Sequence, residues 1–173
     1  MTEMIIEVDK NDNFLCLRAR EDFYSGNHIH RASQLILLDP ENRMLLQKRS
    51  PAKFWFPNRY TYSVSGTVAG ESYEVCMERE MLEELGISVP FRRLFKIPCI
   101  SGNKGAYHTV FTGRCTEETA HLIRFDPEEA VSIEWIGLEE LHRAVETEPG
   151  KYTPSLRAGI MKIFEEGCEK YLF

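Results

Sequence analysis

The sequence predicts a single α+β domain in which helices flank a mixed β-sheet. Strand-like apolar segments dominate the N-terminal half, one long helix lies in the middle of the chain, and two more helices lie near its end. The chain has 173 residues, of which 43% are hydrophobic, and this length and composition suit one domain with its own core. No internal repeat or linker divides it.

The first elements are strands. Residues Met4 to Arg18 form a predicted hairpin, because IIEV and FLCLR flank the turn-rich DKNDN. Ala32 to Leu38 is a mostly apolar strand that ends at the turn sequence Asp39-Pro40-Glu41-Asn42, with proline at its second position. Arg43 to Arg49 is the predicted return strand.

An aromatic loop follows, from Ser50 to Tyr60, and its run Phe54-Trp55-Phe56 suits either the core or the wall of a substrate site. Thr61 to Ser65 alternates as a short strand, which places Tyr62 and Val64 on one side of it.

The clearest helix runs from Tyr73 to Leu85, and Gly86 is a natural residue to end it. At the final helix, Thr153 is a plausible N-cap and Pro154 suits the first helical position. The remaining predicted elements are strands over 92–100, 107–115 and 131–136 and a helix over 138–145.

Composition excludes some functions. A net charge of −6, with 27 acidic against 21 basic residues, argues against a protein that binds long nucleic acids. The five cysteines are widely spaced and include no CxxC pair, so we expect neither a zinc site nor a disulfide framework. No apolar run approaches the ~20 residues that span a bilayer, and no signal-peptide pattern opens the chain. We therefore expect a cytoplasmic protein without a membrane partner.

The most informative segment is 66–87, GTVAGESYEVCMEREMLEELGI. At about 100° per residue, an apolar arc (Val75, Met81, Leu82 and Leu85) opposes a second face that carries Glu80, Glu83 and Glu84. The negative charges of such a carboxylate cluster repel one another, and a hard cation, Mg²⁺ or Mn²⁺, would compensate them. A solvated helix face would have the same composition.

The spacing within this segment resembles the Nudix box, E-x7-R-E-U-x-E-E-x-G-U, where U is apolar. Glu71, Arg79-Glu80-Met81, Glu83-Glu84 and Gly86-Ile87 match it. The box normally begins with a glycine six residues before the first glutamate; here that position is Ser65, and Gly66 is one residue closer. We interpret this as a one-residue deletion, with Gly66 in the family glycine's role.

The resemblance extends to HRASQLILLDPENRMLLQKRS, EWIGLEEL and YTPS, which are similar to the Nudix subgroup related to isopentenyl-diphosphate isomerase. It implies one Nudix domain over 1–173, an α/β/α sandwich around a mixed sheet. The box spans 66–87, and 1–28 form an N-terminal hairpin extension. The resemblance also implies Mg²⁺ (or Mn²⁺) chemistry on a small diphosphate-containing substrate, and it leaves a homodimer open.

By the same resemblance, Glu80, Glu83 and Glu84 would hold the metal, and Arg79 would pair with Glu71. The implied activity is attack of a metal-activated water on a phosphorus anhydride, in a nucleoside-diphosphate-linked substrate. Glu83, Glu84, Arg79 and Glu129 are the expected catalytic residues. The general base stays open between a box glutamate and the later residues Glu128, Glu129 and Glu134.

Basic residues in or beside loops are the candidates for phosphate contacts: Arg49, Lys53, Arg59 and Lys104. Phe56, with its aromatic neighbours, is the candidate for contact with the rest of the substrate.

Isomerisation of isopentenyl diphosphate is the main alternative. The isomerases carry a segment of type S-V-C-G-H, whose cysteine and histidine are replaced here by Ser65 and Thr67. Serine cannot exchange a proton comparably, because its pKa is far higher. His28 and His30 could face one side of a strand as a metal pair, but without a third ligand at Thr67 we expect ordinary strand histidines. A non-catalytic nucleotide-binding module is the other alternative; loss of box glutamates would indicate it, and all are present.

Overall fold

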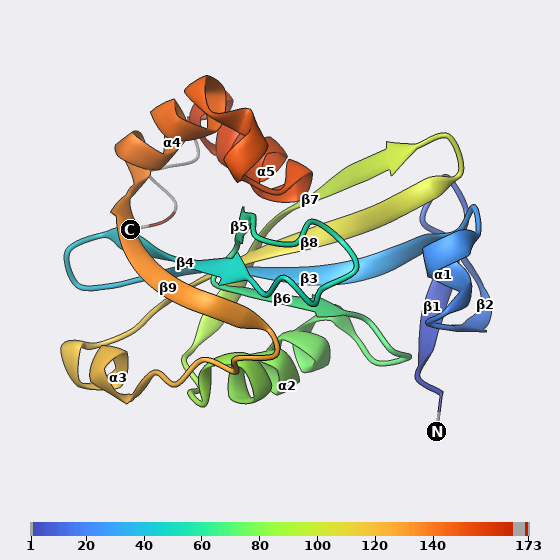
Figure 1. Ribbon diagram of the computed structural model, residues 1–173, viewed down its shortest axis with the longest axis horizontal. Coiled ribbons are helices and arrows are strands. Elements are labelled where there is room, and N and C mark those ends of the chain that lie inside the picture. The colour runs from blue at the N-terminus through green and yellow to red at the C-terminus, as the bar shows by residue number, and fades with distance from the viewer. Residues whose placement is uncertain (1, 168–171, 173) are drawn as a thin grey trace.

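A computed structural model describes residues 2–167 and 172 and shows the predicted mixed sheet between helices (Figure 1). Helix α2 (Tyr73–Leu85) covers one face, and α4 (Leu138–Thr147) and α5 (Pro154–Glu165) cover the other. Short helices α1 (Asp22–Ser25) and α3 (Glu117–Leu122) and a 3₁₀ turn at Pro149–Lys151 complete the helical part. The sequence analysis predicted neither α1 nor α3. No helix in this described part is long and apolar enough to cross a membrane.

The sheet is organised around β3 (Ile29–Leu38). It pairs in parallel with β8 (Lys104–Arg114) along its whole length, from Ile29 opposite Gly105 to Leu38 opposite Arg114. On its other side β3 runs antiparallel to three strands in turn, β1 (Met4–Val8), β6 (Val64–Thr67) and β4 (Arg43–Arg49). The outer strands are β2 (Phe14–Ala19) beside β1, β7 (Phe91–Ser101) beside β8, and β5 (Tyr60–Thr61) and β9 (Ala130–Gly137) beside β4.

Side-chain alternation along β3 builds two cores. Leu35 and Leu37 belong to the cluster under α2, whereas Ile36 and Leu38 belong to the cluster under α4 and α5. All four are fully buried, which explains why this segment reads as continuously apolar.

One strand prediction was wrong. Thr61 to Ser65 is not one strand but the end of β5, a break and the start of β6. Tyr62 and Val64 consequently lie in different core clusters, on opposite faces of the sheet. A single alternating strand would have placed them together, and only the break between β5 and β6 separates them.

The predicted bounds of α2 are confirmed, but only two of the four residues of the predicted apolar arc are buried. Ser72 caps its start by accepting a hydrogen bond from Val75 N, and Gly86 ends it in the left-handed region at φ +67°. Val75 and Leu82 are exposed, at 52% and 57%. Met81 and Leu85 of the predicted arc are buried, together with Tyr73, Cys76, Met77 and Glu84.

The start of α5 positions the site. Thr153 accepts a hydrogen bond from Leu156 N, and Pro154 occupies the first helical position, both as predicted. Because α5 begins here, it covers Ile36 and Leu38 but leaves the earlier part of β3 uncovered. His30, Ala32 and Gln34 alternate onto this open face and line a cavity.

Candidate active site

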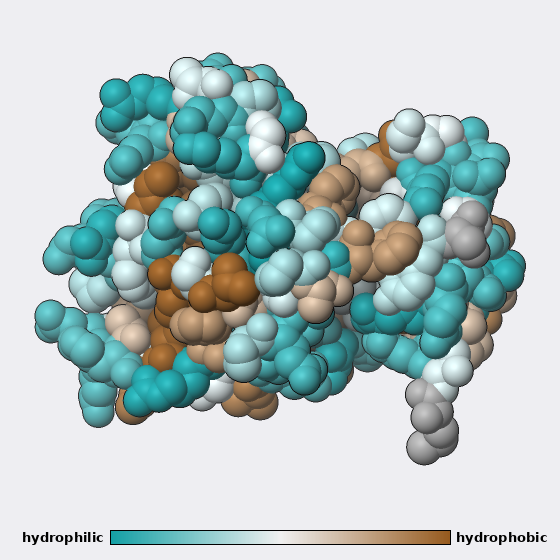
Figure 2. Space-filling view, in the orientation of Figure 1, coloured by the Kyte–Doolittle hydropathy of each residue, from teal (hydrophilic) through white to brown (hydrophobic). Residues whose placement is uncertain are grey.

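The cavity has a volume of about 700 Å³, within the range of small-molecule sites. Strands β3, β6 and β8 form its floor, and the first residues of α5 border it together with Phe54 and Phe56 of the aromatic loop. Apolar side chains reach the surface between α5 and the N-terminal hairpin (Figure 2), and both phenylalanines are exposed, Phe54 at 61%.

Three carboxylates meet at one part of the cavity wall: Glu80 and Glu84 from α2, and Glu129 from the loop before β9. Gly66 on β6 makes room for this approach, since a Cβ at that position would overlap Cγ of Glu80. Although the loop between Gly66 and Glu71 is one residue shorter than in the family pattern, it still has a glycine, Gly66, where β6 approaches α2.

Glu84 is held in place by neutral donors. Gln47 Nε2 donates to Glu84 Oε2 at 2.6 Å and also to Ser63 O at 2.6 Å, and Ser65 N donates to the same carboxylate oxygen at 3.3 Å. Burial, followed by the nearby charges of Glu80 and Glu129, raises the pKa of Glu84 well above its ordinary value. Oε1 of Glu84 has none of these hydrogen bonds.

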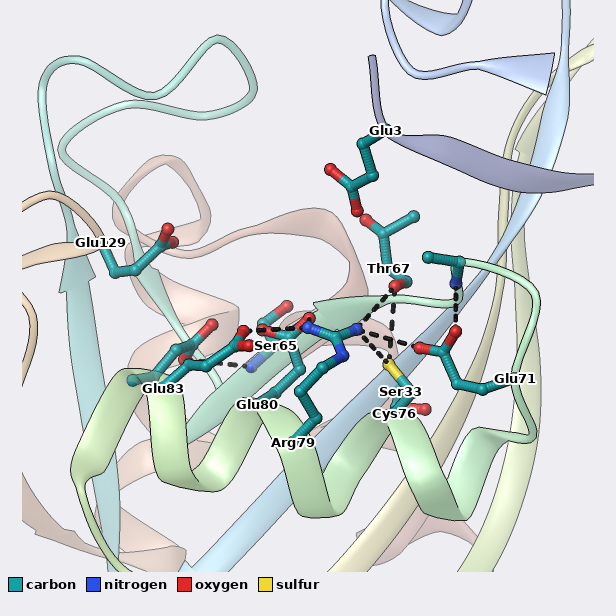
Figure 3. Close-up of polar contacts among 12 residues, drawn as sticks. Glu3, Ser33, Ser65, Thr67, Glu71, Cys76, Arg79, Glu80, Glu83 and Glu129 are labelled. Atoms are coloured by element: carbon teal, nitrogen blue, oxygen red, sulfur yellow. Dashed lines mark hydrogen bonds and ion pairs between the residues drawn. The ribbon is translucent and has the colours of Figure 1, made fainter. Parts of the chain in front are cut away.

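Arg79 organises the neighbouring carboxylates (Figure 3). Its Nη2 donates to Glu71 Oε1 at 2.9 Å, which confirms the predicted pair, while Nη1 lies 2.8 Å from Glu80 Oε1 and 2.9 Å from Glu83 Oε2. Burial raises the pKa of Glu80 to about 7, although Arg79 opposes that shift. Glu71 also accepts from Ala69 N at 3.0 Å, so the pair fixes the loop to the helix.

Glu83 lies apart from the cavity. Its side chain is 58% exposed and salt-bridged to Arg79, whereas Glu80 and Glu84 line the cavity. The structure therefore separates the three expected metal ligands into two inward carboxylates and one at the surface. Of the later glutamates, Glu129 lines the cavity, whereas Glu128 and Glu134 are not among its lining residues.

Three of the four predicted phosphate-binding cations also line the cavity: Arg49, Lys53 and Lys104. Lys53 forms an ion pair with Glu129, and Arg49 is held by a bond from its Nε to Trp55 O at 2.9 Å. Phe56 is a lining residue, but Arg59 is not; its guanidinium lies over the Phe56 ring at 5.5 Å.

The rest of the cavity combines apolar and aromatic side chains with polar ones. The Tyr24 ring of α1 lies against the Phe54 ring at a tilt of 35°, with the ring centroids 4.6 Å apart. Lys104 Nζ lies 4.5 Å from the centre of the Trp55 ring. These contacts join segments that are distant in sequence. Further apolar lining residues are Ile5, Phe23, Pro98, Cys99, Ile100 and Ala106.

Both histidines that the sequence analysis weighed line the cavity. His28 Nδ1 lies 2.6 Å from Glu7 Oε1, and His30 packs edge-on against Phe23. Ser65 and Thr67, which replace the isomerase cysteine and histidine, line it too. The sequence analysis missed Gln47, Gln34 and His108, because only strand pairing reveals where these isolated residues lie.

The donor set fits a hard divalent cation bound partly by water and substrate. Within residues 2–167 and 172, no group of three or more His, Cys, Asp or Glu side chains could form a cage for a metal ion. Mg²⁺ needs no such cage, because it keeps several waters and takes one or two carboxylates plus phosphate oxygens. Glu80 and Glu84 supply this pair, and burial raises the pKa of both carboxyl groups, so a bound cation would favour their ionised forms. The free thiols of Cys16, Cys76, Cys99 and Cys115 form no disulfide, and Cys168 lies outside the described residues.

Sequence and structure comparisons relate the chain to one protein family and to several known proteins. Residues 28–156 match the model of the NUDIX domain family. The chain is 81% identical over 170 residues, 98% of its length and 100% of the other's, to a prenyl-diphosphate phosphatase of Methanosarcina mazei. It is also 27% identical over 163 residues, 88% of each chain, to isopentenyl-diphosphate Delta-isomerase 2 of Photorhabdus laumondii. Among solved structures, the protein DR0079 from Deinococcus radiodurans superposes with a TM-score of 0.78 at 22% identity, over 92% of this chain and 98% of that one.

Proposed function

The chain belongs to the Nudix hydrolase superfamily, in the subgroup related to isopentenyl-diphosphate isomerase, and from this premise we propose that it hydrolyses the diphosphate of a prenyl diphosphate with the aid of Mg²⁺ or Mn²⁺. The 81% identical relative supports a prenyl substrate. The proposal replaces the nucleoside-linked substrate expected from the box alone.

One observation carries the proposal: carboxylates and an apolar wall belong to the same cavity. The carboxylates Glu80, Glu84 and Glu129 line one part of the cavity. Phe23 and Ile100 are among the apolar residues that line the rest. A prenyl diphosphate has the same division, with a charged head and a hydrocarbon chain.

Each residue near the carboxylates has a role that its contacts support. Glu80 and Glu84 would hold the divalent ion, with Gln47 orienting Glu84 and Arg79 orienting Glu80. When bound, that ion would neutralise charge on the phosphoryl oxygens and acidify a water. Lys53 and Arg49 would bind the phosphate oxygens.

The reaction is displacement at the terminal phosphorus. Water forms a bond to that phosphorus, the bond from phosphorus to the bridging oxygen breaks, and its electron pair stays on the prenyl monophosphate. Glu129 would take the proton of the water, since among the later glutamates it alone lines the cavity in the described part of the chain. Lys53, paired with Glu129, would orient this carboxylate.

The test is a substrate panel followed by ³¹P NMR. Geranyl, farnesyl and isopentenyl diphosphates and several nucleoside diphosphate derivatives are incubated with the protein and Mg²⁺. We expect prenyl monophosphate and orthophosphate from the prenyl compounds. Turnover of nucleoside derivatives with no attack on any prenyl diphosphate would refute the proposal. Dimethylallyl diphosphate formed from isopentenyl diphosphate at a catalytic rate would support the isomerase alternative instead.

Two broader assignments accompany this function. We propose that 1–173 form one domain, with the N-terminal hairpin as an extension, because β1 continues the sheet by pairing with β3. We also propose a cytoplasmic location, since the four described cysteines are free thiols.

A further inference from the structure

A pair of polar residues lies on the cavity floor among apolar neighbours. Gln34 on β3 and His108 on β8 both line the cavity, and Gln34 Nε2 lies 3.0 Å from His108 Nδ1. Gln34 is 2% exposed, yet its Oε1 has no hydrogen-bond partner. A buried amide atom without a partner is costly, so its presence in a cavity wall indicates a polar ligand group.

The pair lies directly beside the carboxylate site. Gln34 is opposite Ser65 in the β3–β6 register, and Ser65 N donates to Glu84. Residues that face each other across antiparallel strands point to the same side of a sheet, and Ser65 lines the cavity as well. Farther along the cavity floor, away from Glu84, lie His30 of β3 and Ala106 of β8, which are opposite each other in the parallel pairing.

The pair offers a neutral combination of one donor and one acceptor. If the Gln34 amide donates to His108 Nδ1, the ring carries its proton on Nε2 and can donate it, while Gln34 Oε1 can accept. If the amide is turned over, Gln34 donates and His108 Nε2 accepts. Burial lowers the pKa of His108 to about 3, so the ring is neutral at physiological pH.

We propose that Gln34 and His108 form a subsite for the phosphate group that stays on the prenyl chain. The inference rests on the proposed function, because it assumes a substrate that spans the cavity from Glu84 toward the apolar lining. A phosphate monoester has a second pKa near 6, so around neutral pH it occurs with and without one proton. Its singly protonated form has both a donor and acceptors, which complements the pair in either arrangement.

Binding to metal-free protein tests the subsite separately from catalysis. The dissociation constants of geranyl monophosphate and of geraniol are measured by calorimetry in EDTA, for the wild type, Gln34→Met and His108→Leu. We expect both variants to bind the monophosphate about tenfold more weakly, the effect of leaving one buried polar partner unpaired. Geraniol affinity should stay within about twofold, because the alcohol has no phosphate.

The matched control is Thr112→Val. Thr112 lies on β8 four residues after His108 and also has a buried hydroxyl without a partner, but it does not line the cavity. This variant should bind the monophosphate as the wild type does. His108→Gln, which keeps hydrogen-bonding capacity, should retain more affinity than His108→Leu and guards against misfolding as an explanation.

The outcomes separate the subsite from the proposed function. If the wild type hydrolyses prenyl diphosphates but both variants bind the monophosphate normally, the subsite is wrong and the function stands. Equal losses for monophosphate and geraniol also overturn the subsite, because they indicate a general packing defect. If the monophosphate binds through the pair but no prenyl diphosphate is hydrolysed, the function is wrong and the subsite stands. If the wild type does not bind the monophosphate, the subsite is wrong.

Discussion

Gln47 Nε2 lies 2.6 Å from Glu84 Oε2, and the two residues come from β4 and α2, 37 positions apart in the chain. Gln47 is 3% exposed and also bonds to Ser63 O, so its amide has a fixed orientation. This contact fixes one oxygen of the most buried carboxylate in the site and leaves the other available. Strand β4 therefore orients a carboxylate that α2 supplies.

Gln47→Leu should therefore impair metal binding without unfolding the protein. Loss of a residue that orients a metal ligand commonly costs about 10- to 100-fold in metal affinity or activity. Titration with Mn²⁺, followed by electron paramagnetic resonance, would measure the affinity directly. Gln47→Glu should be worse, because it places a carboxylate against Glu84. Wild-type Mn²⁺ affinity in both variants would contradict an orienting role.

Glu84→Gln and Glu83→Gln should have unequal effects. Glu84 lines the cavity and Glu83 is an exposed partner of Arg79, so we expect Glu84→Gln to lower kcat/KM by more than about 100-fold and Glu83→Gln to cost less. Phosphate release with a prenyl diphosphate and Mg²⁺ measures both variants. Equal and complete loss would mean that Glu83 is a direct ligand after all.

Gly66→Ala tests the close approach of sheet and helix. The added methyl group would overlap Cγ of Glu80, a side chain that can move, so we expect a folded protein with Glu80 displaced. We expect kcat/KM to fall by about tenfold or more, the usual loss when a group that holds or orients a metal ion is displaced. Gly137→Ala is the control, because a Cβ at position 137 meets no atom within 4 Å. Equal activity of the two variants would count against the predicted role of Gly66.

Arg79→Lys should reduce activity even though it keeps the charge. A guanidinium can bond to Glu71, Glu80 and Glu83 at once, and an ammonium cannot reproduce that fork. We expect a loss of about 10- to 100-fold in kcat/KM. Arg93→Gln, which breaks an exposed pair with Glu74, should leave activity and stability nearly unchanged.

The metal-free protein should become more stable as pH falls from 8 toward 5. The pKa of Glu80 is about 7 in the folded state against an ordinary 4.5, so between these values the folded state binds more protons than the unfolded state. Burial is the main cause; Arg79 opposes it, while Glu83 and Glu129 add to it. The stabilisation is present at low pH and is lost as pH rises through about 7.

Thermal melts in EDTA at pH 5.5 and 8 would test this. Glu80→Gln should raise Tm at pH 8 by a few degrees and flatten the dependence, whereas Glu78→Gln, at an exposed position of the same helix, should not. Metal affinity should have the opposite trend in the wild type and increase as pH rises through 7, because the ion must displace the proton. A Glu80→Gln protein with an unaltered pH dependence would contradict the assigned pKa.

Local sequence was sufficient for much of the fold and part of the site. The bounds of α2 depend on Ser72, Gly86 and the residues between them, and the cap of α5 depends on Thr153 and Pro154, so both could be derived from neighbours in the chain. The Arg79–Glu71 pair was implied by the resemblance to the Nudix box, and the structure contains it. Short-range geometry determines the helix bounds and caps.

The orientation of α2 could not be derived in that way. Counting apolar residues placed Val75 and Leu82 inward, but burial of Tyr73, Cys76 and Met77 against the sheet rotates the helix so that Glu84 is buried and Glu83 is exposed. Which side of a helix is buried depends on the shape of the surface it packs against, and sequence periodicity does not contain that shape.

The same reason explains the polar residues that the sequence analysis missed. Gln47 reaches Glu84 from another strand, and Gln34 meets His108 across 74 positions of the chain, because parallel pairing sets β3 beside β8. The resemblance of this segment to the Nudix box implied that the chain handles a diphosphate with a divalent ion. Which carboxylates face the cavity, and what surrounds them, depends on strand register and helix packing, which bring together residues with no local relation in the sequence.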